Sequence, residues 1–373
     1  MKVEATEKIH EPLFHIAKRE SVPLWQGIVV RAVAIVIGLV VCGIIVSASS
    51  SSGKNFFEVY ASLFSGIFGS ERRIRLALQD MALLLGVALA LVVSFKMKFW
   101  NLGGNGQILM GCLACTTCMH YLGGKLPDAV VILLMIISSV LAGAIWAVIP
   151  ALFKAFFKTN ESLFTLMMNY IALHIVSATI TAWFPKGTGA MAPIEYANLP
   201  VLGEGQMGKS LLPILVVVVL TGAMFAYLKF SKHGYELSVV GESENTARYV
   251  GINVKVVIIR TMILSGAICG IIGLLLSGAI NHNVSSNMDG NMGFTGIMVA
   301  WLAKFNPVGM IFSAFFITFI TRGMGQVCTD FGFTNDALSD IIIGNIYFLI
   351  IGCEFFISYK IRFNKKLLRK KES

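Results

Sequence analysis

Long apolar runs separated by short polar loops make up most of this chain. Most of the runs approach the roughly 20 residues that an α-helix needs to cross the hydrocarbon core of a bilayer. The run 293–303 is too short to cross alone, so we expect a broken or re-entrant piece there and count it as one pass. The pattern predicts about ten transmembrane segments, at 27–48, 76–95, 105–122, 129–151, 163–183, 211–230, 256–280, 293–303, 306–322 and 340–359.

The composition agrees with a membrane protein. Hydrophobic residues make up 56% of the 373 residues and charged residues only 13%, with a mean hydropathy of +0.77. Soluble domains carry roughly 25% charged residues, so the chain is too apolar to cover a soluble surface. We predict an all-α polytopic integral membrane protein with an N-terminal tail at 1–26, a transmembrane domain at 27–359 and a basic tail at 360–373. The first apolar run is too long for a signal peptide, so no cleavable leader is expected.

The positions of the basic residues predict the orientation. Ten passes put both termini on one side, and most of the 30 lysines and arginines then lie on the side of the termini. The positive-inside rule makes that side cytoplasmic. The cluster Arg72, Arg73 and Arg75 opposes this count, and an interfacial segment at 55–70 would complicate it, so the side of 55–75 stays open. The basic tail is interpreted as a stop signal that also touches anionic lipid, and nucleic-acid binding is not expected.

Two motifs resemble cofactor sites without the context that such sites need. Residues 203–210 read GEGQMGKS, the letters of a phosphate-binding loop. That loop works when a strand precedes it and a soluble helix follows, whereas here a membrane span follows, so we expect no ATP site in this chain. Cys112, Cys115 and Cys118 form CxxCxxC within an apolar span, where packing of small residues is the expected role. We predict no metal site, no cofactor and no catalytic residue.

The most informative polar segment is the loop 231–255 between two long apolar runs. Ser243 suits a helix N-cap, Glu244 the first turn, Arg248 the last turn and Gly251 the end. These signals predict a helix of about two turns lying in water at the cytoplasmic membrane surface. A helix held there suggests a membrane protein that is driven by a separate soluble motor.

Two glycine-rich breaks interrupt the apolar pattern. Residues 99–111 read FWNLGGNGQILMG, and residues 289–296 read DGNMGFTG before IMVAWLAKFNPVG. Polar and unwound backbone at membrane depth is tolerated where it lines a cavity or is buried in protein. The pair hints at an internal repeat with a central pathway. Ordinary interfacial turns are the alternative.

Four sequence blocks resemble those of ABC-importer permeases in the branched-chain amino acid, ribose and nucleoside superfamily. FWNLGGNGQILMG is similar to FNIGAEGQ, ESLFTLMMNYIA to NEVITTLMLNYIA, HGYELSVVGESENTARYVGI to GYELRAVGLNPKAARYAGI, and GFTGIMVAWLAKFNPVGM to GFDGIAVALLGRNNPLGI. The blocks occur in the same order from about residue 75 to 320. The N-terminal region resembles the larger permease of bacterial nucleoside importers. Asn105 stands where the family has an acidic residue, and Ser238 and Thr246 also depart from its pattern.

The resemblance implies a permease subunit, without its own ATPase site, that imports nucleosides across the bacterial cytoplasmic membrane. It implies three protein partners: an ATP-binding subunit, a second permease subunit and an extracytoplasmic substrate-binding lipoprotein. The residues that match the coupling segment, and would dock on the ATP-binding subunit, are Gly234, Tyr235, Glu236, Gly241, Asn245, Ala247, Arg248, Tyr249 and Gly251. Ala247 and Val250 would supply apolar contacts and Arg248 a charged one.

The substrate pathway and the rival functions rest on fewer residues. A nucleoside would need aromatic faces and neutral hydrogen-bonding groups. The pathway candidates are Asn101, Asn105, Gln107, Asn169, Phe294 and Trp301, although each also fits internal packing. A permease for ribose or another simple sugar is the alternative within the class. Asp80 and Glu354 keep a proton-coupled secondary transporter open, and a membrane-embedded enzyme is a further rival without a proposed chemistry.

Overall fold

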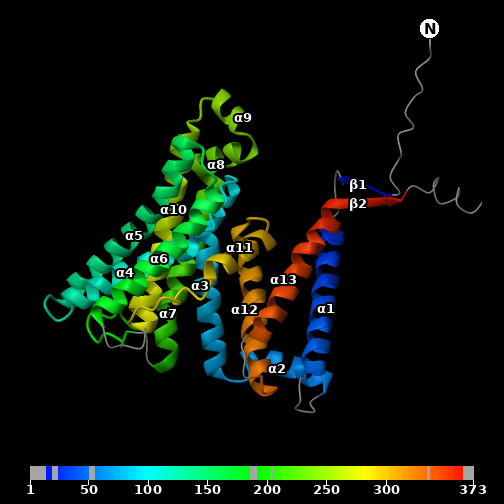
Figure 1. Cartoon of the computed structure of the whole chain (residues 1–373), viewed down its shortest axis with the longest axis horizontal. Helices are drawn as coiled ribbons and strands as arrows, with labels where there is room; N and C mark the ends of the chain where they lie inside the picture. The colour runs from blue at the N-terminus through cyan, green and yellow to red at the C-terminus, as the bar shows by residue number, and fades with distance from the viewer. Residues whose placement is uncertain are drawn as a thin grey trace, which may run out of the picture. The chain divides into compact units, whose positions relative to one another are not determined.

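A computed structural model describes residues 14–18, 24–49, 55–184, 191–202, 205–333 and 337–363, and helices dominate them (Figure 1). The helices are α1 Leu24–Ser49, α2 Phe56–Phe68, α3 Glu71–Lys96, α4 Gly104–Leu122, α5 Asp128–Phe157, α6 Glu161–Trp183, α7 Gly205–Phe230, α8 Lys232–Glu242, α9 Glu244–Tyr249, α10 Val254–Leu274, the π-helical continuation Leu275–Asn281, α11 Met292–Leu302, α12 Pro307–Asp330 and α13 Ala337–Ser358. Two short strands, β1 Phe14–Lys18 and β2 Tyr359–Phe363, complete the described elements. The predicted all-α class is confirmed.

Seven of the described helices are long and apolar enough to cross a membrane. They are α1, α3, α5, α6, α7, α10 with its π-helical continuation, and α12. Each of the ten predicted segments overlaps a described helix, and α11 is as short as expected for a broken span. The seven confirm a multi-pass membrane protein, while the count of ten passes stays a prediction. The possible interfacial segment 55–70 is the helix α2.

The chain divides into two compact units, and the larger one spans Ser65–Arg322. Within it α3 and α10 are the most buried of the long apolar helices. Helix α10 approaches α5 so closely that a Cβ atom on Gly143 would touch the backbone of Gly266 and Gly270. In lipid, where burial of apolar surface gives little driving force between helices, such backbone approach supplies the packing contacts. This tight core holds the two glycine-rich breaks in place.

The smaller unit combines residues 1–64 with 323–373, and within it α1 packs against α13. Strand β1 pairs antiparallel with β2, from Phe14 opposite Phe363 to Lys18 opposite Tyr359. Because β1 precedes α1 and β2 follows α13, this pairing holds the N-terminal end of α1 near the C-terminal end of α13. Most of the predicted tails 1–26 and 360–373 lies outside the described residues.

The motifs that resemble cofactor sites have packing roles where the structure describes them. Residues 203–204 of the GEGQMGKS segment lie outside the described residues, and the segment from Gly205 belongs to α7. Ser210 is buried and donates a hydrogen bond to Gln79 of α3 over 2.6 Å. Cys112 and Cys115 are buried free thiols, and no group of three metal-ligating residues occurs in the described parts of the chain.

Candidate functional site

The two glycine-rich breaks meet each other inside the larger unit. Asn105, at the start of α4, accepts a hydrogen bond from the Gly293 backbone N–H over 2.6 Å. Its Nδ2 donates to Asn291 over 3.4 Å. The approach is so close that a Cβ atom on Gly293 would collide with Asn105. The side chain of Asn105 therefore joins two segments that are 186 or more residues apart in the chain.

Asn101 and Gln107 continue this buried polar layer. Asn101 donates from Nδ2 to the Ser265 hydroxyl of α10 over 3.2 Å. Its Oδ1 accepts from Gln107 Nε2 over 3.2 Å and from the Gly103 N–H over 3.0 Å. The Oε1 atom of Gln107 is buried without a hydrogen-bond partner in the described part of the chain. The layer thus ties the loop before α4 to α10 and leaves one acceptor open.

Helix α6 holds the same loop from the other side. Asn169 accepts from the Gly106 N–H and donates to the Leu102 carbonyl, both over 2.8 Å. The Thr165 hydroxyl accepts from the Leu102 N–H over 3.1 Å. Unwound backbone in a bilayer needs such partners because water is absent. Asn169 and Thr165 therefore satisfy backbone groups that a continuous helix would satisfy itself.

The six predicted pathway residues fall into two groups. Asn101, Asn105, Gln107 and Asn169 are buried and bond within the chain, whereas Phe294 and Trp301 are partly exposed, at 38% and 44%. Trp301 lies beside Trp100 of the first break, with ring centroids 5.5 Å apart. The structure therefore gives the four amides a structural role and leaves the two aromatic residues accessible. Their contact with a substrate stays a prediction.

Helix α6 also carries a polar stripe that the sequence reading missed. Tyr170, His174 and Thr181 are exposed and Ser177 is partly buried, and the four follow one another at spacings of four, three and four residues. The hydroxyls of Ser177 and Thr181 bond to carbonyls one turn back in the helix. No hydrogen bond of Tyr170 or His174 occurs within the described residues. The helical spacing of polar residues in an otherwise apolar span was the signal that could have revealed this face.

The predicted helix in the polar loop is confirmed as α9. The Ser243 hydroxyl accepts from the Thr246 N–H over 3.3 Å, and Glu244 and Arg248 form an ion pair over 3.4 Å. Gly251 ends the helix with a φ of +87°, a conformation that glycine adopts without strain. The structure adds α8, which the sequence reading left as loop and which the Ser231 side chain caps. Helices α8 and α9 lie together at one end of the larger unit (Figure 1).

Three residues of this segment fix it to the spans. Gly234 and Gly241 allow close approach, since a Cβ atom on Gly234 would meet the Tyr227 carbonyl oxygen of α7 and one on Gly241 the Lys96 carbonyl of α3. Glu236 accepts a hydrogen bond from Arg260 of α10 over 2.9 Å. This bond to Arg260 lowers the pKa of the Glu236 carboxyl despite some burial. Ala247, an expected partner contact, is fully buried within this chain, so it offers no outer surface.

Several other residues of the segment are exposed. Tyr235 and Tyr249 are 65% and 94% exposed, and Val250 is also exposed. Asn245 and Arg248 lie on the exposed part of α9. Large exposed aromatic side chains next to an arginine are typical of a protein-binding surface. The segment therefore has an inner face that holds it to three spans and an outer face that is available for a partner.

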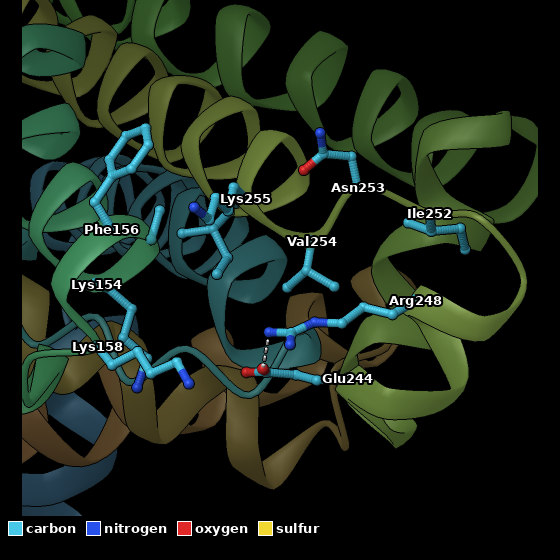
Figure 2. Close-up of a pocket in the computed structure, with 11 residues that line it drawn as sticks. Lys154, Phe156, Lys158, Glu244, Arg248, Ile252, Asn253, Val254 and Lys255 are labelled. Atoms are coloured by element: carbon cyan, nitrogen blue, oxygen red, sulfur yellow. Dashed lines mark hydrogen bonds and ion pairs between the residues drawn. The ribbon is translucent and has the colours of Figure 1, made fainter.

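A cavity of about 670 Å³ lies between α9, the end of α5 and the start of α10. Arg248 and Glu244 reach toward it from α9, and Lys154 and Lys158 reach toward it from the end of α5 (Figure 2). Lys255 and Phe156 also line it, with the Lys255 ammonium 4.8 Å from the centre of the Phe156 ring. The lining is therefore mainly basic, with one aromatic wall.

Multiple apolar helices, unwound glycine-rich breaks held by side chains and a separate surface helix define a polytopic transport permease rather than a soluble protein. The chain belongs to the family described as branched-chain amino acid transport system / permease component, whose profile matches residues 74–351. A permease of this class is the membrane component of an ABC transporter. An ATP-binding subunit is therefore a partner of this chain.

Three curated relatives span nearly the whole chain. The guanosine ABC transporter permease protein NupP of Bacillus subtilis (strain 168) is 28% identical, over 92% of this chain and 97% of the relative. The nucleoside ABC transporter permease protein NupB of Lactococcus lactis subsp. cremoris (strain MG1363) is 28% identical, over 90% and 92%. The glucose ABC transporter permease protein TsgB13 of Haloferax volcanii is 25% identical, over 92% of both chains.

Proposed function

We propose that this chain imports nucleosides as one permease subunit of an ATP-driven transporter in the bacterial cytoplasmic membrane, with both termini cytoplasmic. The two most similar relatives named above are permeases for guanosine and for nucleosides, which supports this substrate class. The chain acts without an ATPase site of its own. A second permease subunit and an extracytoplasmic substrate-binding lipoprotein complete the transporter.

The observation that carries the proposal is that the coupling segment, residues 231–255, has one face packed on the spans and another exposed. Its inner face contacts α3, α7 and α10 through Gly241, Gly234 and Glu236. Its outer face presents Tyr235, Arg248 and Tyr249. A segment that packs against three spans transmits a displacement to all of them. Movement of a docked ATP-binding subunit would therefore tilt these spans together. A loop without these contacts would move with the ATP-binding subunit and leave the spans in place.

The outward polar face of α6 supports a substrate pathway beside this helix. Tyr170 and His174 project from a span, where polar groups that face lipid are costly. A water-filled pathway shared with a second permease subunit removes that cost. An imidazole and a phenol offer hydrogen bonds and a flat ring to a nucleoside. Phe294 and Trp301 stay candidates for further contacts along the pathway.

Sugar import is the second candidate, favoured by the glucose permease among the relatives. Ribose is part of every nucleoside, so one set of hydroxyl-binding groups serves both substrates. Stacking on the base is what separates them, because a free sugar has no aromatic face. The discriminating property is therefore uptake of ribose compared with uptake of ribonucleosides.

The deciding experiment is uptake of labelled uridine, adenosine and ribose by cells that produce the chain with its partners. Arg248→Glu is compared with wild type, and Lys125→Glu, a charge reversal in the loop between α4 and α5, is the matched control. We expect Arg248→Glu to abolish nucleoside uptake while the protein remains in the membrane and the control transports normally. Ribose uptake alone would move the substrate to sugars. An uptake rate that neither Arg248→Glu nor ATP depletion changes would refute an ATP-driven permease.

A further inference from the structure

The basic cavity beside α9 contains more positive than negative charge. Of the charged residues that line it, Lys154, Lys158, Arg248 and Lys255 are cationic and Glu244 is anionic. Glu161 neutralises Lys154 over 2.7 Å, and Glu244 pairs with Arg248 over 3.4 Å. Lys158 and Lys255 have no ion pair within the described residues. The cavity therefore keeps an excess of about two positive charges for an external anion.

The position of the cavity limits which anion it meets. Lys158 follows the last residue of α5, and Lys255 lies in the first turn of α10, so both ammonium groups lie where a span leaves the membrane. Phe156 is exposed on the same helix end and forms one wall of the cavity. An exposed phenylalanine beside lysines fits the boundary between acyl chains and headgroups, where the ring meets hydrocarbon and the ammonium groups meet phosphate.

We propose that this cavity binds the phosphate of an anionic phospholipid headgroup, through Lys158 and Lys255, beside the coupling helix. Lys158, Lys255 and the N-terminal end of α10 line a space of about 670 Å³, which is large enough for a glycerophosphate headgroup. Arg248 and Glu244 form the wall that α9 contributes. A bound headgroup would link α5, α9 and α10, so lipid composition would affect how firmly α9 is held.

This inference uses the membrane placement proposed above but none of the substrate assignment. The test uses the assembled transporter in nanodiscs of phosphatidylcholine with a minor fraction of phosphatidylglycerol. Native mass spectrometry measures how many phosphatidylglycerol molecules the complex retains. For wild type, we expect the complex to retain phosphatidylglycerol above its fraction in the disc. In the double variant Lys158→Gln, Lys255→Gln, this enrichment should fall by roughly fivefold for each lysine removed.

The matched control removes two other lysines near span ends. Lys98 is exposed after α3, and Lys229 in the last turn of α7 lies 5.3 Å from the Phe225 ring centre, much as Lys255 lies near Phe156. The double variant Lys98→Gln, Lys229→Gln should retain as much phosphatidylglycerol as wild type. An equal loss in this control would mean that phosphatidylglycerol follows overall charge, and it would overturn the proposal.

Acylation of lysines separates the headgroup from other occupants of the cavity. Phosphatidylglycerol should slow acylation of Lys158 and Lys255 relative to discs of phosphatidylcholine alone. Equal protection by inorganic phosphate would assign the cavity to a free anion, and full protection without any anionic lipid would assign it to the ATP-binding subunit. Either result overturns the lipid proposal. Nucleoside uptake by cells that produce the same variants reports on the proposed function independently.

Discussion

At the scale of single residues, a few amide side chains make the unwound breaks possible. Asn105 bonds the backbone of Gly293, and Asn169 bonds the backbone at Gly106 and Leu102. The sequence revealed that polar residues gather at these breaks. It could not show that they face inward, because the groups that accept and donate to them lie 63 to 188 residues away. Their role as internal connectors follows from tertiary contact alone.

The contact at Gly293 predicts a large effect of a small substitution. In Gly293→Ala the added methyl group would overlap Asn105 and separate the two breaks. We expect a loss of about 1–3 kcal/mol in the free energy of unfolding, measured as a lower melting temperature of the purified protein in detergent. Gly222→Ala is the control, because a Cβ atom there meets nothing within 4 Å. Equal melting temperatures for the two variants would contradict the close approach.

The Glu236–Arg260 pair predicts a pH dependence. The hydrogen bond from Arg260 lowers the pKa of the Glu236 carboxyl in the folded protein. The stabilisation is therefore fully present above the ordinary glutamate pKa of roughly 4.3 and is lost as pH falls through the lower folded value. Protection factors of residues 232–242, which are exchange rates corrected for the intrinsic pH dependence of amide exchange, should fall over this acidic window in wild type. Glu236→Gln should show low protection factors that change little across the same window. A wild-type pH dependence shared by the variant would assign the effect to another group.

At the scale of elements, the coupling segment shows how far local sequence extends. The capping residues Ser243 and Gly251 predicted α9 correctly because a cap involves residues within a few positions of each other. Helix α8 was missed because its glycines at 234 and 241 are poor helix formers. They are present because α8 lies against the backbone of α7 and α3, where a side chain would not fit. Packing outweighs propensity there.

An ion pair connects two spans and bears on the rival mechanism. Asp80 of α3 and Arg322 of α12 lie 2.5 Å apart. Asp80→Asn leaves Arg322 without its partner, and we expect a loss of roughly 1–3 kcal/mol in the free energy of unfolding. The double variant Asp80→Asn, Arg322→Gln should recover most of the melting temperature, because neither charge is left alone. Uptake by that double variant should continue, whereas a proton-coupled carrier that depends on Asp80 would lose it.

At the scale of the whole molecule, burial decides which polar residues are available for transport. Helix α6 presents Thr165 and Asn169 to the core and Tyr170 and His174 outward. Of these four side chains, Tyr170 and His174 are the accessible pair. The sequence analysis selected Asn169 and not the neighbouring Tyr170. Both faces of α6 carry polar residues, so hydropathy could not show which face is buried.

The outward face of α6 predicts a transport defect without a folding defect. His174→Leu and Tyr170→Phe should each reduce nucleoside uptake by roughly tenfold, by removing one hydrogen-bonding group. Thr179→Val is the control on the same helix, because its hydroxyl bonds within the helix to the Ile175 carbonyl. Uptake rates are compared at equal amounts of protein in the membrane. A pathway elsewhere would leave the two stripe variants at the rate of the control.

The sequence by itself determined the properties that depend on neighbouring positions along the chain. Run length and hydropathy predicted the spans, capping residues predicted α9, and four ordered blocks predicted the family. Tertiary structure decided which amides are buried, which face of α6 is outward, and how lysines from α5 and α10 gather beside α9. These properties arise from close approach of segments distant in sequence, where the backbone of one helix determines the space and the hydrogen-bond partners of another.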